Sequence, residues 1–360
     1  MDRAAYDVVL GSLTKIFGSE KAVDSINLNV EKGEYLFLLG PSGCGKTTTL
    51  RMIGGLENPT GGKIWICGED METVPAHRRK TAMVFQNFAL FPHMSVAENI
   101  EFGLRARGVD KAERKERLNR MLDLLGIASV ASEKPERLSD GEKQRVALGR
   151  ALILQPRVLL LDEPLGSMEL GLRERMLIEL KKFQREVKIT FIHVSHDQKE
   201  AMLTSDRTVL MNRGRIEQVD SPHVLYRAPL TKFAATFFQS SNLMDGVIDS
   251  VSGRVAKVKN GLGEFVIETD RLIPPIGSQV SFIIFYDHMK RIGGDEFINR
   301  VEGILKGEQV IGTLIVYSVE LENRQIFRFT EHMSERGRHL EANQRVALYW
   351  RPRDAVFLSH

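Results

Sequence analysis

The sequence lacks long apolar runs and has almost no cysteine. None of its 360 residues lies in an apolar stretch of about 18 residues, so we expect no transmembrane helix. The first seven residues lack the apolar core of a signal peptide. The two cysteines, Cys44 and Cys67, are too few for a disulfide framework and indicate a protein of the reducing cytosol. Nothing in the sequence indicates a zinc or haem site.

The overall composition is that of an ordinary soluble globular protein. Hydrophobic residues make up 42% and charged residues 27% of the chain, and 360 residues are enough for two or three domains with hydrophobic cores. The formal net charge of +3 is too small to predict binding to nucleic acid or to a membrane surface. Predictions about function therefore depend on the motifs.

One glycine-rich stretch fits the pattern G-x-x-x-x-G-K-[ST] and lies between a predicted strand, residues 35–39, and a predicted helix, residues 48–53. Glycines let backbone N–H groups surround phosphates, Lys46 can reach the β- and γ-phosphates, and the Thr47 hydroxyl can bind Mg²⁺. A chance glycine-rich turn is the alternative, but the order of strand, loop and helix argues against it. The predicted nucleoside triphosphate site comprises Gly40, Pro41, Ser42, Gly43, Cys44, Gly45, Lys46, Thr47 and Thr48.

Polar side chains stand at the ends of three further apolar runs. Carboxyl ends of strands in an α/β sheet face the ligand crevice, where one of Asp162 and Glu163 can hold Mg²⁺ through water and the other can orient the attacking water. Gln86 can bind Mg²⁺ or that water. The alternative is a glutamine in a surface loop, and Gln86 alone does not outweigh that alternative. His196 beside the γ-phosphate is favoured over a structural histidine, and the two acids over a chance acidic turn. The three runs are residues 81–85, 158–163 and 190–195.

The segment before the glycine-rich stretch predicts antiparallel strands. Residues 8–30 alternate apolar and polar side chains and are interrupted at Gly18-Ser19, so we expect two strands leading into the nucleotide-binding sheet. Phe17 lies in a part of this segment with turn chemistry. An exposed Phe17 can stack on adenine, and a core phenylalanine is an equal alternative.

Two capping boxes predict helix starts in the middle of the chain. Ser95 precedes Glu98 by three residues, and Ser139 precedes Glu142 by the same spacing, so helices begin after each serine. The second helix is predicted to run to Gln155, before Pro156. The apolar, proline-bearing loop 87–96 has no strand or helix period that would bury it, which indicates a docking surface for a partner.

In their order and spacing, these motifs resemble the ATP-binding subunits of ABC transporters. The resemblance covers roughly residues 5–235 and rests on the glycine-rich loop, the stretch 138–142, and the polar residues at the strand ends. It implies a RecA-like α/β P-loop ATPase domain at residues 1–238, with a helical subdomain at about 87–155, and ATP and Mg²⁺ as cofactors.

The resemblance also implies roles for individual residues. Phe17 becomes the adenine-stacking aromatic, Glu163 the catalytic carboxylate and His196 the γ-phosphate switch. Gln86 belongs to the catalytic group as well, and Thr47, Gln86 and Asp162 become the Mg²⁺ ligands.

The implied assembly is an importer with its ATPase at the cytoplasmic face of the membrane. A second ATPase subunit, identical or paralogous, completes a head-to-tail dimer, in which each ATP lies between one phosphate loop and the partner's signature helix. Loop 87–96 contacts the transmembrane permease subunits, a solute-binding protein takes part indirectly, and no nucleic acid is expected. The signature residues are Ser139, Asp140, Gly141 and Glu142.

The chain departs from this family at two places. The signature is usually Leu-Ser-Gly-Gly-Gln, but Asp140 and Glu142 occupy its third and fifth positions here. The loop after Pro164 usually carries an aspartate, and here residues 165–169 contain none. These changes concern the rate of hydrolysis more than the binding of ATP.

The last third of the chain, residues 239–360, predicts an all-β domain of small-barrel type. It resembles the transport-associated OB-like domain of sugar, polyamine and iron importers, nearest to the polyamine branch. A rival hypothesis is an ABC-type ATPase that acts on nucleic acid through this tail. Aromatic residues in alternating apolar strands argue against that rival, because they fit a core better than a stacking platform; examples are Phe265, Phe282 and Phe327.

Overall fold

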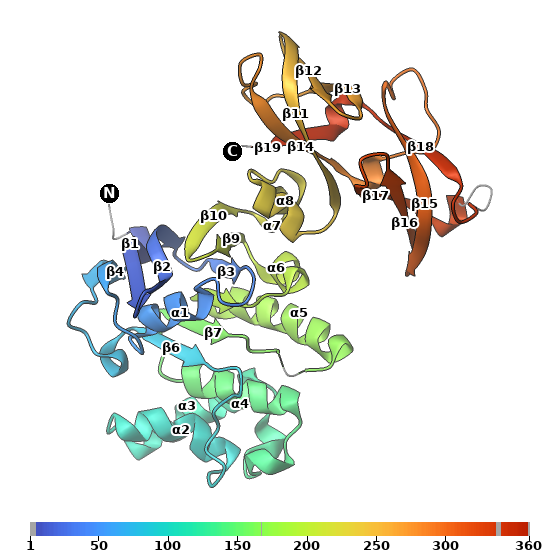
Figure 1. Ribbon diagram of the computed structural model, residues 1–360. Coiled ribbons are helices and arrows are strands. Elements are labelled where there is room, and N and C mark those ends of the chain that lie inside the picture. Colours follow the sequence, from blue (N-terminus) through green and yellow to red (C-terminus); the bar gives the residue numbers. More distant parts are fainter. Residues whose placement is uncertain (1–4, 167, 336–339, 359–360) are drawn as a thin grey trace. The chain divides into compact units, whose positions relative to one another are not determined.

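The structure is a computed structural model that describes residues 5–166, 168–335 and 340–358. The chain forms two compact units, Met1–His223 and Val224–His360 (Figure 1). The sequence places the boundary later, between residues 238 and 239. Residues 224–238 belong to the second compact unit because their aromatic side chains pack there: the ring of Tyr226 lies 5.9 Å from that of Phe285. No helix of the described residues is long and apolar enough to cross a bilayer.

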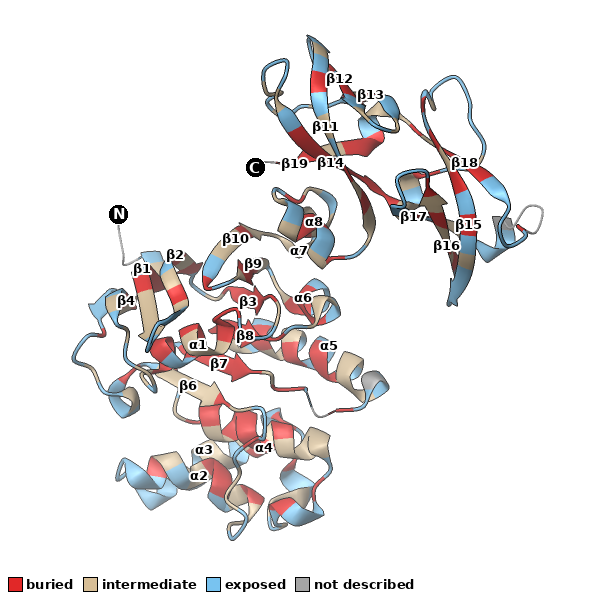
Figure 2. Ribbon diagram, in the orientation of Figure 1, coloured by how far each residue is buried: buried red, intermediate tan, exposed pale blue. Residues whose placement is uncertain are grey.

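A six-stranded sheet forms the centre of the first unit, in the order β10-β9-β3-β8-β7-β6. All neighbouring pairs are parallel except β10 and β9. Every residue of β3, β7 and β8 is buried, as expected for parallel strands covered on both faces (Figure 2). The strands are β3 (Tyr35–Leu39), β6 (Thr81–Val84), β7 (Val158–Asp162), β8 (Thr190–Val194), β9 (Arg207–Asn212) and β10 (Arg215–Asp220).

Three helices each follow a strand of this sheet and return the chain toward the edge of the sheet at which the strands begin. They are α1 (Lys46–Gly54) after β3, α5 (Leu170–Val187) after β7 and α6 (Gln198–Thr204) after β8. Such crossovers put the loops after the strands at one edge of the sheet. The predicted strand at residues 35–39 and the helix after the glycine-rich loop are confirmed.

The antiparallel pairing predicted for residues 8–30 is confirmed, but the strands form a separate sheet. Its order is β2-β1-β4-β5, and its inner face shares a hydrophobic core with the central sheet through residues such as Val8, Leu36 and Leu160. Val8, Leu10 and Leu13 of β1 belong to this shared core, so β1 packs on the central sheet instead of extending it. The strands are β1 (Tyr6–Phe17), β2 (Glu20–Glu31), β4 (Gly61–Ile66) and β5 (Glu69–Asp70).

Three helices between β6 and β7 have a hydrophobic cluster of their own, which includes Val96, Leu122 and Val146. Both predicted capping boxes are present, at Ser95 and Ser139. The helix that begins after Ser139 is predicted to run to Gln155, and in the structure it ends three residues earlier, at Leu152. The helices are α2 (Val96–Ala106), α3 (Lys111–Leu124) and α4 (Asp140–Leu152).

The second unit is built from two antiparallel sheets around one core. Their orders are β13-β12-β11-β14-β19 and β17-β16-β15-β18. Phe265 and Trp350 stack in the core with ring centroids 5.4 Å apart. Phe265, Phe282 and Phe327 are at most 1% exposed, which confirms the prediction that they are core residues.

The strands of the second unit are β11 (Ser241–Ser252), β12 (Val255–Asn260), β13 (Gly263–Glu268), β14 (Gln279–Phe285), β15 (Asn299–Ile311), β16 (Leu314–Leu321), β17 (Ile326–His332), β18 (Arg345–Trp350) and β19 (Ala355–Leu358). The helix α7 (Pro222–Arg227) begins at the division between the units, and α8 (Lys232–Phe237) follows it.

Candidate active site

The glycine-rich loop between β3 and α1 has a backbone that requires glycine. Gly40 and Gly45 have φ angles of 150° and 100°, which L side chains rarely adopt. A Cβ atom on Gly45 would lie 2.3 Å from the carbonyl oxygen of Ala22, and one on Gly40 would lie 2.3 Å from that of Met211. Because backbone atoms block both positions, the curled loop cannot form with another residue at either glycine.

Lys46 begins α1 and points back into this loop. Its Nζ donates hydrogen bonds to the carbonyl oxygens of Gly40 and Pro41, both at 2.8 Å, and the side chain is buried. Burial raises the pKa of the neighbouring Cys44 thiol, which keeps it a neutral residue of the loop. The ammonium group of Lys46 is thus held inside the concave loop where phosphate oxygens would be bound.

Thr47 and Asp162 meet across the loop. The Thr47 Oγ1 donates to Asp162 Oδ1 at 3.2 Å, which joins the start of α1 to the carboxyl end of β7. Burial raises the pKa of Asp162, and the hydrogen bond from Thr47 acts in the opposite direction. A hydroxyl and a desolvated carboxylate are hard oxygen donors of the kind that Mg²⁺ takes.

Glu163 lies between two other predicted site residues. Its Oε2 accepts a hydrogen bond from Gln86 Nε2 at 3.3 Å, and its Oε1 lies 3.3 Å from His196 Nδ1. The backbone of Glu163 has a φ angle of 44°, a conformation that is strained in a non-glycine residue and often occurs at functional sites. Side chains at the ends of β6, β7 and β8 therefore converge on one carboxylate.

Phe17 at the end of β1 is 48% exposed, with Lys15 Nζ 4.8 Å from the centre of its ring. This exposure excludes the alternative of a core phenylalanine. The ring remains available to a ligand or partner.

The signature residues lie at the amino end of α4. Glu142 Oε2 accepts hydrogen bonds from the backbone N and the Oγ of Ser139, at 2.8 and 2.7 Å, and these bonds lower the pKa of Glu142. Asp140 forms an ion pair with Lys143 at 3.2 Å. Among the described residues, no hydrogen bond joins this turn, which includes Gly141, to the phosphate loop.

Loop 87–96 exposes fewer of its apolar side chains than the sequence predicts. Phe88 is buried, Leu90 packs on the hydrophobic cluster of α2–α4, and the ring of Phe91 packs at a tilt against that of Phe102, with ring centroids 4.7 Å apart. These apolar side chains are thus partly covered by their own helical layer, which local periodicity could not indicate. The 39% exposed Phe102 is accessible in this region, as are four exposed loop residues: Asn87, Ala89, Pro92 and His93.

Arg173 on α5 is a site residue that no sequence motif indicated. Its guanidinium donates to the carbonyl oxygens of Gly166 and Met168, at 3.3 and 3.1 Å, and lies 3.6 Å from Asp197. It thereby joins the loop after Glu163 to the residue that follows His196. Ser167, in the loop that departs from the family pattern, lies outside the described residues.

Comparison with known proteins agrees with this geometry. Residues 23–166 match the ABC transporter family, and residues 288–358 match the TOBE domain. The chain is 42% identical to a spermidine/putrescine import ATP-binding protein of Thermobifida fusca, over 94% of this chain and 88% of that protein. A protein of the same description from Acidothermus cellulolyticus is 38% identical over 98% of this chain and 94% of its own length.

A solved structure shares the fold of the ATPase unit. It is a dimeric ATP-binding cassette in a post-hydrolysis state with ADP and Pi, 30% identical, with a TM-score of 0.53, covering 60% of this chain and 98% of its own. The chain thus combines an ATP-binding cassette with a β-rich TOBE domain. It belongs to the ATP-binding proteins of ABC transporters and is an ATPase that energises import.

Proposed function

We propose that this ATPase subunit powers the uptake of a polyamine of the spermidine/putrescine class. Support comes from relatives of that description, which are similar over most of the chain, including the TOBE domain. The catalytic part of the proposal rests on one observation: Glu163 is held between Gln86 and His196 at the carboxyl edge of the central sheet.

In this proposal the phosphate loop binds the triphosphate, with Lys46 compensating its negative charge and Phe17 stacking on the adenine. Glu163 orients and polarises the attacking water, and Gln86 and His196 fix its carboxylate. His196 then contacts the γ-phosphate. Thr47, Asp162 and Gln86 would hold Mg²⁺, which when bound supplies positive charge to the phosphate oxygens.

The working unit is proposed to be a head-to-tail dimer at the cytoplasmic face of the membrane. The dimeric ATP-binding cassette that shares the fold of the ATPase unit supports this, and a second subunit would bring its residues Ser139–Glu142 to the nucleotide. Permease subunits would hold the dimer at the membrane through the region of loop 87–96, and a solute-binding protein would deliver the polyamine.

Two substitutions test the catalytic assignment. We expect Lys46→Ala to weaken ATP binding, because the buried ammonium is lost from the phosphate loop. We expect Glu163→Gln to bind ATP as the wild type does and to lower the turnover number by about 10²-fold or more, because the amide cannot polarise water. Nucleotide affinity and steady-state hydrolysis measured on the assembled transporter separate the two effects. Equal nucleotide affinities for the two variants would contradict the assignment.

The solute is tested by transport. The native complex, purified with its membrane and solute-binding subunits and placed in liposomes, should take up labelled spermidine or putrescine when ATP is present on the ATPase side. The Glu163→Gln complex is the matched control and should take up neither. Uptake of a sugar, with no uptake of either polyamine, would contradict the proposed solute and leave the ATPase assignment intact.

A further inference from the structure

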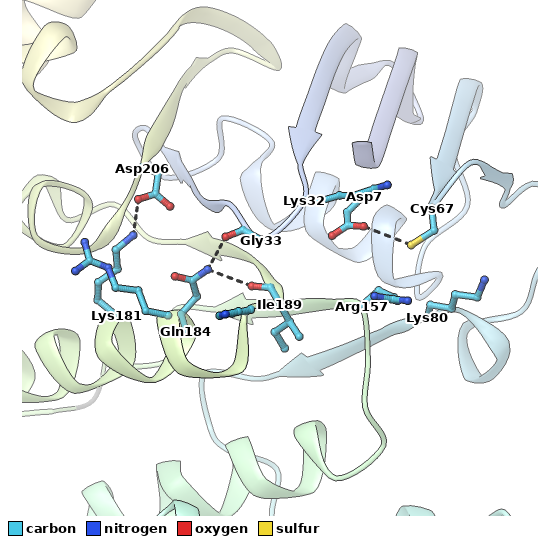
Figure 3. Close-up of a pocket in the computed structure, with 12 residues that line it drawn as sticks. Asp7, Lys32, Gly33, Cys67, Lys80, Arg157, Lys181, Gln184, Ile189 and Asp206 are labelled. Carbon is cyan, nitrogen blue, oxygen red and sulfur yellow. Dashed lines mark hydrogen bonds and ion pairs between the residues drawn. The ribbon is translucent and has the colours of Figure 1, made fainter. Parts of the chain in front are cut away.

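A cavity of about 610 Å³ lies at the edge of the central sheet opposite the nucleotide site (Figure 3). Residues just before the parallel strands contribute to it, and the amino ends of parallel strands share one edge. Asp162 ends β7 and Glu163 follows it at the other edge, so the two sites are separated by the length of the strands. The residues before β3, β6, β7, β8 and β9 that line the cavity are Gly33, Lys80, Arg157, Ile189 and Asp206.

Positive charge dominates this cavity. Six of its lining side chains are cationic and two are carboxylates, and Ile189 is the one aliphatic residue among them. The cationic residues come from loops and from α5, distant in sequence; they are Lys32, Lys80, Arg157, Lys181, Arg185 and Lys188.

Both carboxylates are engaged with the protein. Asp206 accepts a hydrogen bond from the backbone N of Tyr35 at 2.9 Å and pairs with Lys181 Nζ at 2.6 Å. Asp7 accepts hydrogen bonds from the Thr190 hydroxyl and from the Cys67 thiol. These bonds hold the loops around the cavity together. Lys181 offsets the charge of Asp206, whereas the donors to Asp7 are neutral, so Asp7 keeps its negative charge and remains outnumbered by the other cations.

Four of the cations have no carboxylate partner among the residues that the structure describes: Lys32, Arg157, Arg185 and Lys188. Arg157 also lies beside another cation, since its backbone N donates to the carbonyl oxygen of Lys80 at 2.8 Å. Lys80 pairs with Glu69, which raises the pKa of Lys80, and Arg157 acts in the opposite direction by repulsion. Cations thus outnumber carboxylates here, and the ion pairs of Lys80 and Lys181 compensate only part of the positive charge.

The helix α5 accounts for only part of this charge. Arg185 and Lys188 stand at its carboxyl end, where cations stabilise the helix dipole. Lys32, Lys80 and Arg157 belong to loops, for which that explanation fails. Lys188 also occupies the helix C-cap with a φ angle of 52°, a position at which glycine is preferred.

We propose that this cavity binds a compact polyanion with two or more phosphate groups. Its volume lies within the range of about 300–1,000 Å³ that is usual for small-ligand sites, but its charged lining is unlike their mostly apolar walls. The planar guanidinium groups of Arg157 and Arg185 can bind phosphate oxygens in pairs. The ligand is a soluble polyphosphate or the headgroup of a diphosphate lipid, which share this chemistry.

Calorimetric titration of the full chain with tripolyphosphate tests the proposal, with ADP at saturation to fill the phosphate loop. We expect one further molecule to bind, with an affinity that falls as salt is added. The double variant Arg157→Gln with Arg185→Gln should bind about tenfold or more weakly, because each arginine supplies charge-assisted hydrogen bonds. The control Arg117→Gln with Arg120→Gln, on the exposed helix α3, should bind as the wild type does.

Lys188→Gly separates binding from folding. It removes one cation and relieves a strained backbone, so the melting temperature should stay equal or rise while tripolyphosphate binding weakens. Phosphatidylcholine vesicles that contain cardiolipin test whether the ligand is a lipid headgroup. Binding of these vesicles by the wild type, with loss of binding in the variant that carries Arg157→Gln and Arg185→Gln, would identify the lipid as the ligand. Equal loss of affinity in the α3 control, or no binding of either ligand beyond the ADP site, would overturn the proposal.

Discussion

A buried histidine of the ATPase unit has a strongly lowered pKa. His193 on β8 is fully buried, and its Nδ1 forms a hydrogen bond with the Tyr35 hydroxyl at 2.9 Å. Its ring also packs 4.5 Å from that of Phe37. Burial lowers the pKa of His193 from 6.5 to about 3, since a charged imidazole would lose its hydration. His193 is therefore neutral in the folded protein throughout the physiological range of pH.

This pKa predicts acid sensitivity with a definite sign. As the pH falls below 6.5, the unfolded chain protonates His193 and the folded protein does not, so stability is lost between that value and about 3. Relative to a His193→Gln variant, we expect the free energy of unfolding of the wild type to fall by about 1.4 kcal/mol per pH unit in this window. Denaturant titrations at several pH values measure it.

Two controls isolate the effect. Glu200 lies 3.6 Å from His193 Nε2, and burial raises its pKa, so its own contribution to stability is lost as the pH rises above the ordinary value. Glu200→Gln removes that opposing dependence. The exposed His77→Gln should leave the pH profile unchanged. Parallel profiles for the wild type and His193→Gln would show that His193 is protonated in the folded state.

At the scale of elements, the amino end of α4 combines two conflicting functions. Glu142 caps its own helix through Ser139, and Asp140 is partly neutralised by Lys143, so both acids suit the isolated helix. In the proposed dimer the same turn faces a nucleotide with several negative charges. One carboxylate about 7 Å from a phosphate costs on the order of 2 kcal/mol at an effective dielectric near 20.

We therefore expect the double substitution Asp140→Gly with Glu142→Gln to raise the ATPase turnover of the assembled transporter several-fold. Glutamine preserves the capping box, so the helix should begin at the same residue. The single variants Asp140→Gly and Glu142→Gln show which acid opposes closure; the bonds of Glu142 to Ser139 suggest that Asp140 has the larger effect. Turnover at or below the wild-type value in the double variant would refute the attenuation.

At the scale of the whole molecule, the surface near loop 87–96 is the proposed contact with the permease subunits. We expect a cysteine at His93 to cross-link to a membrane subunit in the assembled transporter, in a Cys67→Ser background that leaves only the buried Cys44. A cysteine at His77, which is exposed on a different loop, should not. Cross-links from His93→Cys that stay within the chain would contradict the docking surface.

Much of the fold follows from local patterns. The continuous apolar runs gave β3, β7 and β8 within a residue, because parallel strands covered on both faces tolerate few polar side chains. The long strands β11 and β15 were not predicted. Polar residues and glycine interrupt their apolar positions, so the sequence pattern of a strand is weak there. The burial of Phe88 was missed for a related reason: a loop has no period that reveals which side chains are covered.

The sequence by itself determined the features that depend only on residues close together in the chain. The glycines of the phosphate loop are needed for its backbone, and the capping boxes at Ser95 and Ser139 close within three residues. Tertiary structure alone decided that Gln86 and His196 meet at Glu163. It also decided that cations from separate loops and from α5 line one cavity at the opposite edge. Those arrangements result from the packing of distant segments, whose free energy is summed over the whole core and is not written in any short stretch.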